Sequence, residues 1–227
     1  ILGIDAAPNA VLKALKKNIP TFPALFNEDI AKLIHNEYGQ AKIVMANNCI
    51  AHVNDLNNFM YGVDKLLAKN GVFIFETGYW GNMIKRANYE QIYHDHYCYF
   101  SINVWRTYLK KFEMKIFDAV VTPAQDNCAI RVFICRDDRK ETGRLKEIVA
   151  DEEENGINTH ERSIRYRDEV RLSCNKLKEK LLELKNVGKT IAAYGASAKA
   201  GTIARAADIG NDLIDYYVDD APAKQGL

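Results

Sequence analysis

The chain has 227 residues, of which 48% are hydrophobic and 27% charged, the composition of a globular protein with its own core. Its 31 Lys and Arg residues balance 30 Asp and Glu residues. The net charge of +1 therefore gives no electrostatic reason to expect nucleic acid or an anionic membrane as a partner. No apolar run reaches the roughly 18 residues of a membrane span, so no transmembrane helix is expected.

The five cysteines form no C-x-x-C pair, and their odd number argues against a disulfide framework. They favour a reducing, cytoplasmic setting, and their scatter argues against a zinc site made by this chain alone. The chain starts without Met inside an apolar run at Ile1, and its last residues follow a strand with nothing to close the domain. We therefore expect missing sequence at both ends.

Apolar runs alternate with helical patterns in the first half, which predicts α/β layers around a mostly parallel sheet. The expected strands are residues 1–5, 41–46 and 71–76. Pro8 lies in the first turn of a predicted helix over residues 8–18. Asp55 is a suitable N-cap for the next helix, which runs through Leu67.

Residues 77–100 are aromatic and polar without a clear period, and a loop of this length inside a compact domain is usually functional. A helix is predicted over residues 102–111. Residues 114–121 and 128–135 resemble two strands of an antiparallel hairpin, which would complete a mixed sheet.

Residues 141–186 are densely charged with both signs mixed, and apolar residues such as Val170 and Leu177 recur there at helical spacing. Amphipathic helices with a solvated outer face are predicted, connecting two domains. A second α/β unit follows, with expected strands at 190–194 and 213–218 and a helix at 198–207. The predicted organisation is a first domain over 1–140, a helical connector over 141–186 and a Rossmann-like domain over 187–227.

Polar residues follow two of the predicted strands, at the ends where open α/β sheets bind ligands. Asp5 follows Gly3-Ile4; its carboxylate either accepts hydrogen bonds from both ribose hydroxyls or caps the following turn. Asn47 and Asn48 follow the second strand. Their amides suit a zwitterionic ligand, or they form a polar turn. The residues alone leave both alternatives open.

The aromatic stretch contains Tyr93-His94-Asp95-His96. A histidine, with an ordinary pKa of about 6.5, accepts a proton near neutral pH, and aromatic neighbours exclude water or face a sulfonium cation. In an extended segment His94 and His96 would share one face, with Asp95 on the other. The pattern does not choose between the two histidines. No third ligand of suitable spacing accompanies them, so no metal site is expected.

The turn from Gly195 through Ser197 to Lys199 leads from a strand into a helix, and its N–H groups can face an anion. It is neither a Walker loop nor a nucleophile elbow. Asp219 follows at about the spacing of the ribose-binding acid of dinucleotide folds. A nicotinamide-dependent oxidoreductase is therefore an alternative, against which the missing second and third glycines of that fingerprint count.

Taken in order, these motifs resemble the nucleotide-sugar C-methyltransferase family. The segments that carry the resemblance are Gly3-Ile4-Asp5, Ala46-Asn47-Asn48, Ala51-His52-Val53, residues 71–76, residues 89–96, Tyr99-Phe100-Ser101, residues 193–199 and residues 215–226. They span essentially the whole chain, and the block at 93–96 and the C-terminal tail are the most specific parts.

The resemblance implies S-adenosylmethionine-dependent C-methylation of a small nucleotide-linked substrate, a dTDP-linked 4-keto-deoxysugar, at a carbon deprotonated beside the ketone. It also implies a class I methyltransferase-type mixed sheet followed by a Rossmann-like α/β domain. The implied cofactor residues are Gly3, Asp5, Asn47 and Asn48. His96 would be the base, and Tyr93, Asp95 and His52 would position the substrate or steady the enolate. The implied substrate contacts are Tyr79, Tyr194, Gly195, Ser197, Lys199 and Asp219.

Family members also carry an N-terminal zinc module, a Gly-rich turn ahead of the first strand and a longer C-terminal domain, which the 227 residues lack. Both domains are therefore expected to be truncated. Asp95 stands where the family often has Glu, and its shorter arm changes whatever contact that acid makes. Because the Gly-rich turn is a main cofactor contact, a non-catalytic nucleotide-binding fragment is a further alternative.

Overall fold

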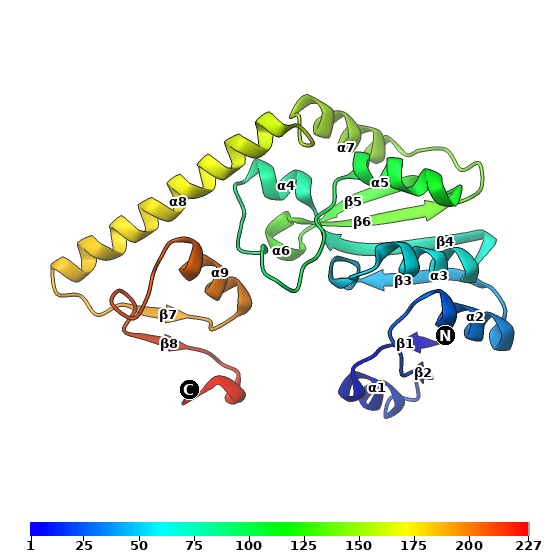
Figure 1. The fold of residues 1–227 in the computed structure, drawn as a ribbon, viewed down its shortest axis with the longest axis horizontal. Helices are drawn as coiled ribbons and strands as arrows, with labels where there is room; N and C mark the ends of the chain where they lie inside the picture. The colour runs from blue at the N-terminus through cyan, green and yellow to red at the C-terminus, as the bar shows by residue number, and fades with distance from the viewer. Residues whose placement is uncertain (227) are drawn as a thin grey trace.

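The computed structural model describes residues 1–226 as a mixed α/β fold (Figure 1). The first elements in chain order are β1 (Gly3–Ile4), α1 (Pro8–Leu15), β2 (Thr21–Phe22), α2 (Glu28–Tyr38), β3 (Ala41–Asn47), η1 (Ile50–His52), α3 (Leu56–Leu66), β4 (Leu67–Gly78) and α4 (Trp80–Lys85). They are followed by α5 (Ile102–Leu109), η2 (Lys110–Phe112), β5 (Lys115–Thr122), α6 (Ala124–Asn127), β6 (Ala129–Cys135), α7 (Gly143–Glu154), α8 (His160–Asn186), β7 (Ala192–Tyr194), α9 (Ala198–Ala206), β8 (Tyr216–Val218) and η3 (Pro222–Lys224).

The central sheet has four strands in the order β3-β4-β6-β5. Strands β3 and β4 are parallel, with Asn47 opposite Glu76 at their carboxyl ends. Strand β6 is antiparallel to both β4 and β5. The predicted hairpin and the mixed sheet are therefore confirmed, and the hairpin inserts its second strand between β4 and the first.

One face of this sheet carries the main core. Phe73 and Phe75 on β4 are fully buried there beside Trp105 of α5, and helices α3, α5 and α7 cover them. Burying a side chain of this size stabilises a fold by roughly 1.5–3 kcal/mol. The opposite face is open over β3, where the side chains of Ile43 and Met45 are about 60% exposed. The alternation along β3 and β4 thus distinguishes a packed face from an open one.

Strands β1 and β2 form a separate parallel pair below the central sheet (Figure 1). A groove of about 810 Å³ lies between β1 and β3, and residues of α2 and α3 complete its lining. The carboxyl ends of the two strands lie near each other. Ile4 at the end of β1 and Ala46 near the end of β3 both line this groove.

The predicted helix start at Asp55 is confirmed, since its Oδ1 accepts a hydrogen bond of 3.0 Å from the Asn58 N–H at the start of α3. Helix α1 ends at Leu15, earlier than predicted, and the chain turns at Asn18 with φ +56°. Strand β4 is longer than predicted because it begins directly after α3. Helix α2 was not predicted, although Asn27 caps its start.

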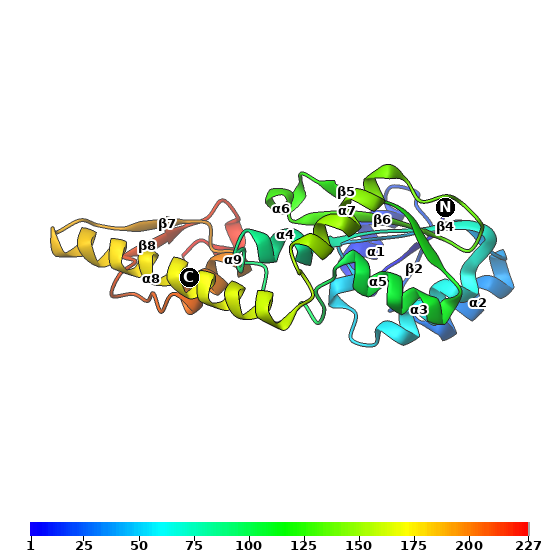
Figure 2. The same ribbon diagram turned by 90° about the horizontal axis from the view of Figure 1, so that it is seen from above.

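Helix α8 leads the chain away from the central sheet to the parallel pair β7–β8 and to α9 (Figures 1 and 2). The predicted amphipathic helices are confirmed as α7 and α8. Tyr166 and Cys174 of α8 are buried, whereas most of its surface is charged and exposed. The two C-terminal strands are shorter than predicted, with three residues each. The division into two domains remains a prediction.

Among the helices of residues 1–226, none combines the length and the apolar character that crossing a membrane requires. Helix α8 is long enough, with 27 residues, but its sequence is densely charged.

Candidate active site

The site begins where β3 ends. The backbone of Asn48 has φ +50°, a left-handed conformation that Asn tolerates better than most residues. Its N–H donates to the Glu76 carbonyl at 2.7 Å, which ties the turn to β4. The chain then forms η1, which presents His52 beyond the carboxyl end of the sheet.

The aromatic segment that follows β4, residues 79–100, is called the insert below, and backbone contacts join its two ends. Tyr79 forms a parallel bridge with Phe100, and the Trp80 N–H donates to the Phe100 carbonyl at 2.9 Å. The buried carboxylate of Glu152, on α7, accepts hydrogen bonds from the Tyr79 hydroxyl at 3.0 Å and from the Ile102 N–H at 2.6 Å. One acidic side chain therefore joins the start and the end of the insert.

The middle of the insert is held against η1. The Tyr97 N–H donates to the Ala51 carbonyl at 2.8 Å, and His52 Nδ1 donates to the Asp95 carbonyl at 2.7 Å. These two bonds bring the turn that carries His96 to the carboxyl end of β3. Helix η1 and the insert thus contribute one histidine each to the same site.

Four rings form what we call the histidine cluster: His52, Tyr93, His96 and Tyr99. The ring centroids of His52 and His96 are 4.6 Å apart, and those of Tyr93 and His96 are 4.2 Å apart. Tyr99 meets His96 edge-on at 5.9 Å. Burial raises the pKa of Tyr93, with a contribution from Asp95, so its hydroxyl stays protonated and able to donate near neutral pH.

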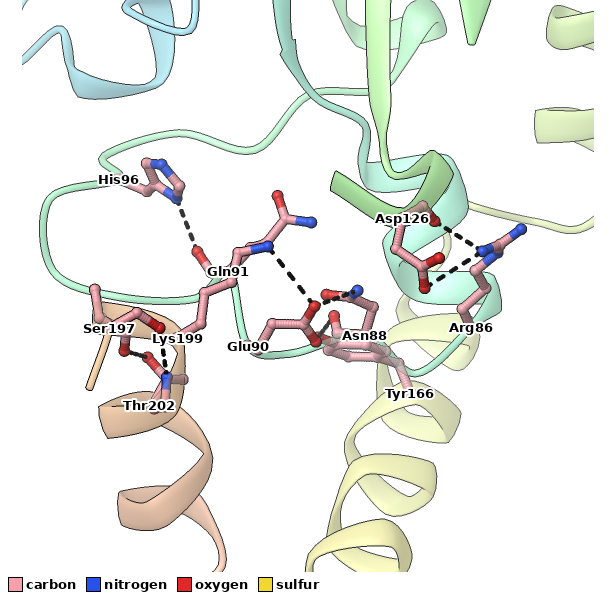
Figure 3. A network of polar contacts seen from close by, with 12 residues as sticks. Arg86, Asn88, Glu90, Gln91, His96, Asp126, Tyr166, Ser197, Lys199 and Thr202 are labelled. Atoms are coloured by element: carbon pink, nitrogen blue, oxygen red, sulfur yellow. Dashed lines mark hydrogen bonds and ion pairs between the residues drawn. The ribbon is translucent and has the colours of Figure 1, made fainter. Parts of the chain in front are cut away.

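His96 Nδ1 lies 2.8 Å from the Gln91 carbonyl oxygen (Figure 3). Because a carbonyl only accepts, Nδ1 carries the hydrogen, and the lone pair of the neutral ring is on Nε2. Burial lowers the pKa of His96, and the neighbouring charges of His52 and Lys199 lower it further. The Gln91 hydrogen bond and the charge of Asp95 oppose this shift. The net effect is a neutral imidazole that can accept a proton at Nε2.

The segment around residue 95 is a turn and not extended, since the His96 N–H donates to the Tyr93 carbonyl at 3.0 Å. The extended conformation, in which His94 and His96 would share one face, is therefore not adopted. The His94 side chain is 93% exposed and pairs with the Asp95 carboxylate at 2.9 Å. Asp95 contacts the cluster through its backbone carbonyl, which holds His52. The described residues contain no group of His, Cys, Asp and Glu that could hold a metal ion.

The predicted cofactor residues lie at the ends of β1 and β3. Asp5 Oδ1 accepts a hydrogen bond of 2.8 Å from the Ala7 N–H, which is the turn-capping alternative. Gly3 has a structural reason to be Gly, because a Cβ there would lie 2.9 Å from Oγ1 of Thr21 on β2. Asn47 is exposed at the end of β3.

Tyr79, predicted to contact substrate, is 1% exposed, and its hydroxyl is engaged by Glu152. Burial and the charge of Glu152 raise the pKa of this phenol. The structure therefore places Tyr79 in the core and not in the histidine cluster.

The C-terminal turn uses several of its predicted ligand residues for its own structure. Gly195 has φ +96°, which favours glycine, and Ser197 caps α9. The Asp219 carboxylate accepts hydrogen bonds from the N–H groups of Ala196 and Ala221 at 2.8 and 2.9 Å. Both of its oxygens are thus engaged, which weakens the case for a ribose-binding acid in a nicotinamide enzyme.

The hydroxyl of Tyr194 donates to Asp220 at 2.7 Å, and this side chain is 75% exposed. Of the predicted substrate residues in the C-terminal part, Lys199 is the one that reaches the insert, at 3.9 Å from Glu90.

Four residues with a part in the site were given no role from the sequence, although the first three lie in motifs that carry the resemblance: Glu90, Gln91, Tyr99 and Glu152. Gln91 acts through its carbonyl, and a backbone group leaves no signal in a sequence. Glu152 is one acid within an acidic run, and only packing distinguishes it from its neighbours.

Residues 128–227 match the model of the C-methyltransferase C-terminal domain. Over 228 aligned residues the chain is 29% identical to C-methyltransferase NovU of Streptomyces niveus, a match that covers 100% of this chain and 54% of that protein. The chain thus spans about half the length of this curated relative. A chain in a solved complex that contains the Haloferax volcanii Trm112 methyltransferase activator has 15% identity and a TM-score of 0.41, over 66% of this chain and 65% of that one. By both comparisons, the family model and the curated relative, the chain is similar to C-methyltransferases.

Proposed function

We propose that this chain is the catalytic part of an S-adenosylmethionine-dependent C-methyltransferase that acts beside the ketone of a nucleotide-linked 4-keto-deoxysugar. The observation that carries the proposal is the state of His96. Its Nδ1 donates to a carbonyl, which leaves the Nε2 lone pair for a proton, and its pKa is lowered. A methyltransferase that alkylates carbon needs such a base, because carbon must first lose a proton to become a nucleophile.

His96 Nε2 takes the proton from the carbon beside the ketone. The electron pair of the broken C–H bond forms an enolate, whose negative charge rests mainly on the ketone oxygen. The ring centroids of Tyr93 and His96 are 4.2 Å apart, and the Tyr93 hydroxyl stays protonated. This hydroxyl is therefore suited to donate a hydrogen bond to the enolate oxygen. His52 donates its Nδ1–H to the Asp95 carbonyl, so its neutral ring offers Nε2 as an acceptor that can position a substrate hydroxyl.

The residues at the strand ends fit a cationic, ribose-containing donor. Among the described residues the turn engages only Oδ1 of Asp5, so Oδ2 remains for a ribose hydroxyl. Asn47 adds a neutral amide at the end of β3. Bound S-adenosylmethionine would supply a methyl group on a sulfonium centre for the enolate carbon, with S-adenosylhomocysteine as the leaving group. The sugar and its dTDP carrier are proposed from the motif resemblance.

A binding experiment tests the donor. Calorimetric titration of the protein with S-adenosylhomocysteine should give binding, whereas NAD should not bind. Asp5→Ala should weaken S-adenosylhomocysteine binding about tenfold or more, as expected for hydrogen bonds to a charged group worth ~1.5–3 kcal/mol. Asp212→Ala, at an exposed aspartate of the C-terminal part, is the matched control. Binding of NAD without S-adenosylhomocysteine would overturn the proposal in favour of an oxidoreductase.

A further inference from the structure

One cation from the C-terminal part of the chain reaches the insert. Lys199 Nζ on α9 lies 3.9 Å from Glu90 Oε1, and the two side chains are 40% and 26% exposed (Figure 3). Glu90 also accepts a hydrogen bond of 3.0 Å from Asn88 Nδ2. The Asn88 carbonyl in turn accepts one of 2.8 Å from the hydroxyl of Tyr166 on α8. Lys199 therefore joins α9 to a segment that α8 already holds.

This segment ends at the group that orients His96. The Gln91 carbonyl accepts hydrogen bonds from His96 Nδ1 at 2.8 Å and from the Tyr99 hydroxyl at 3.2 Å. Within residues 1–226, the buried Gln91 Nε2 and Asn88 Oδ1 have no hydrogen-bond partner. Buried polar atoms without partners cost free energy. The side chains of residues 88–91 therefore do not fully determine the conformation of this segment. A contact from another element, such as Lys199 on α9, then contributes more to holding it in place.

We propose that Lys199 is a positioning residue for His96, which holds Glu90 and thereby the adjacent Gln91 carbonyl that orients the imidazole. The inference rests on the proposed role of His96 as the base. It adds that α9, which lies far away in the sequence, sets the geometry and the charge around that base. An exposed surface pair contributes little to stability, so the effect is expected on the imidazole and not on folding.

The charges around His96 give the inference a second consequence. The titratable groups that face the ring are His52 from η1, Lys199 from α9 and Asp95 from the insert, together with the phenols of Tyr93 and Tyr99. Burial is the largest contribution that lowers the pKa of His96. His52 and Lys199 lower this pKa further, and Asp95 raises it. Removing the charge of Lys199 should therefore raise this pKa.

The test is an NMR titration of the full protein, in which His96→Asn assigns the His96 Cε1–H signal. Lys199→Met should move the His96 midpoint to higher pH and speed solvent exchange of the Nδ1–H. Lys199→Arg should restore both values. Glu90→Gln leaves the Lys199 ammonium in place. It should therefore speed solvent exchange of the His96 Nδ1–H without raising the titration midpoint of His96. The matched control is Lys180→Met, because Lys180 pairs with Glu183 within α8, and it should leave both values unchanged.

The inference is overturned if Lys199→Met leaves the midpoint and the exchange rate unchanged, or if Lys180→Met changes them equally. Because the titration needs neither methyl donor nor sugar, its result is independent of the proposed reaction. A protein in which Lys199 tunes His96 but His96→Asn still transfers methyl groups would refute the base assignment and leave the tuning in place.

Discussion

Replacing Glu152 should loosen the two ends of the insert that carries His96. The side chain is 1% exposed. Its Oε1 accepts from the Tyr79 hydroxyl and the Ile102 N–H, and its Oε2 accepts from the Asn103 N–H at 2.9 Å. The last two donors belong to the first turn of α5, where N–H groups have no partner inside the helix. Glu152 thus caps α5 from another helix.

Because Oε1 and Oε2 of Glu152 have different partners, the free-energy cost of each substitution can be estimated separately. In Glu152→Gln, an amide oxygen at the Oε1 position keeps two bonds, but the amide NH₂ then meets the Asn103 N–H, at a cost of ~1–3 kcal/mol. Tyr79→Phe removes one hydroxyl and should cost ~1 kcal/mol. Glu152→Ala leaves two buried donors and the partly buried Asn103 N–H unpaired and should cost ~3–5 kcal/mol. Burial raises the pKa of Glu152, so its ionised form bears a desolvation cost that favours the lower ends of these ranges.

Urea unfolding, followed by far-ultraviolet circular dichroism and by tryptophan fluorescence, measures these free energies. The control is Glu153→Gln, at the exposed neighbour of Glu152, which should change the free energy of unfolding by less than ~0.5 kcal/mol. The reasoning is refuted if Glu152→Ala costs no more than Tyr79→Phe, or if Glu153→Gln costs as much as Glu152→Gln.

Two further predictions concern the base and the packing of α2 on α3. Because the pKa of His96 lies below its ordinary 6.5, the ring is neutral at pH 7, and kcat/KM should fall on acidification with a midpoint below pH 6.5; a midpoint above 6.5 would contradict the burial argument. A Cβ at Gly62 would lie 2.8 Å from the Asn27 carbonyl oxygen, whereas one at Gly143 would meet nothing within 4 Å. Gly62→Ala should therefore destabilise the fold by ~1–3 kcal/mol, and Gly143→Ala should be neutral or stabilising by less than ~1 kcal/mol; equal effects in urea unfolding would contradict the packing.

Local signals in the sequence predicted much of the central sheet. The Asp55 cap and the apolar run of β4 identify their elements because backbone and side-chain preferences act over a few residues. Helix α2 was overlooked because charged residues interrupt its apolar positions, although Asn27 at its start and Gly39 at its end, with φ +77°, are standard signals. The separation of β1–β2 from the central sheet depends on pairing between distant strands, which local signals do not report.

The site was predictable in its residue types but not in its arrangement. His96 and Tyr93 were singled out, but the choice between His94 and His96 needed the turn that exposes one ring and stacks the other. Tyr79 has the same chemistry as Tyr93 and lies in the core. Asp219 has the spacing of a ligand-binding acid, yet backbone N–H groups engage its carboxylate. Tertiary contacts decide each of these cases.

Proton abstraction by His96 can be measured apart from methyl transfer. In D₂O with S-adenosylhomocysteine present, a dTDP-linked 4-keto-deoxysugar should exchange the hydrogen beside its ketone for deuterium, observed by proton NMR. His96→Asn should slow this exchange by about 10²–10⁴-fold, the usual contribution of a general base, toward the rate without protein. His94→Asn, which alters a ring that is 93% exposed, should exchange at the wild-type rate. Exchange by His96→Asn at the wild-type rate would contradict the account.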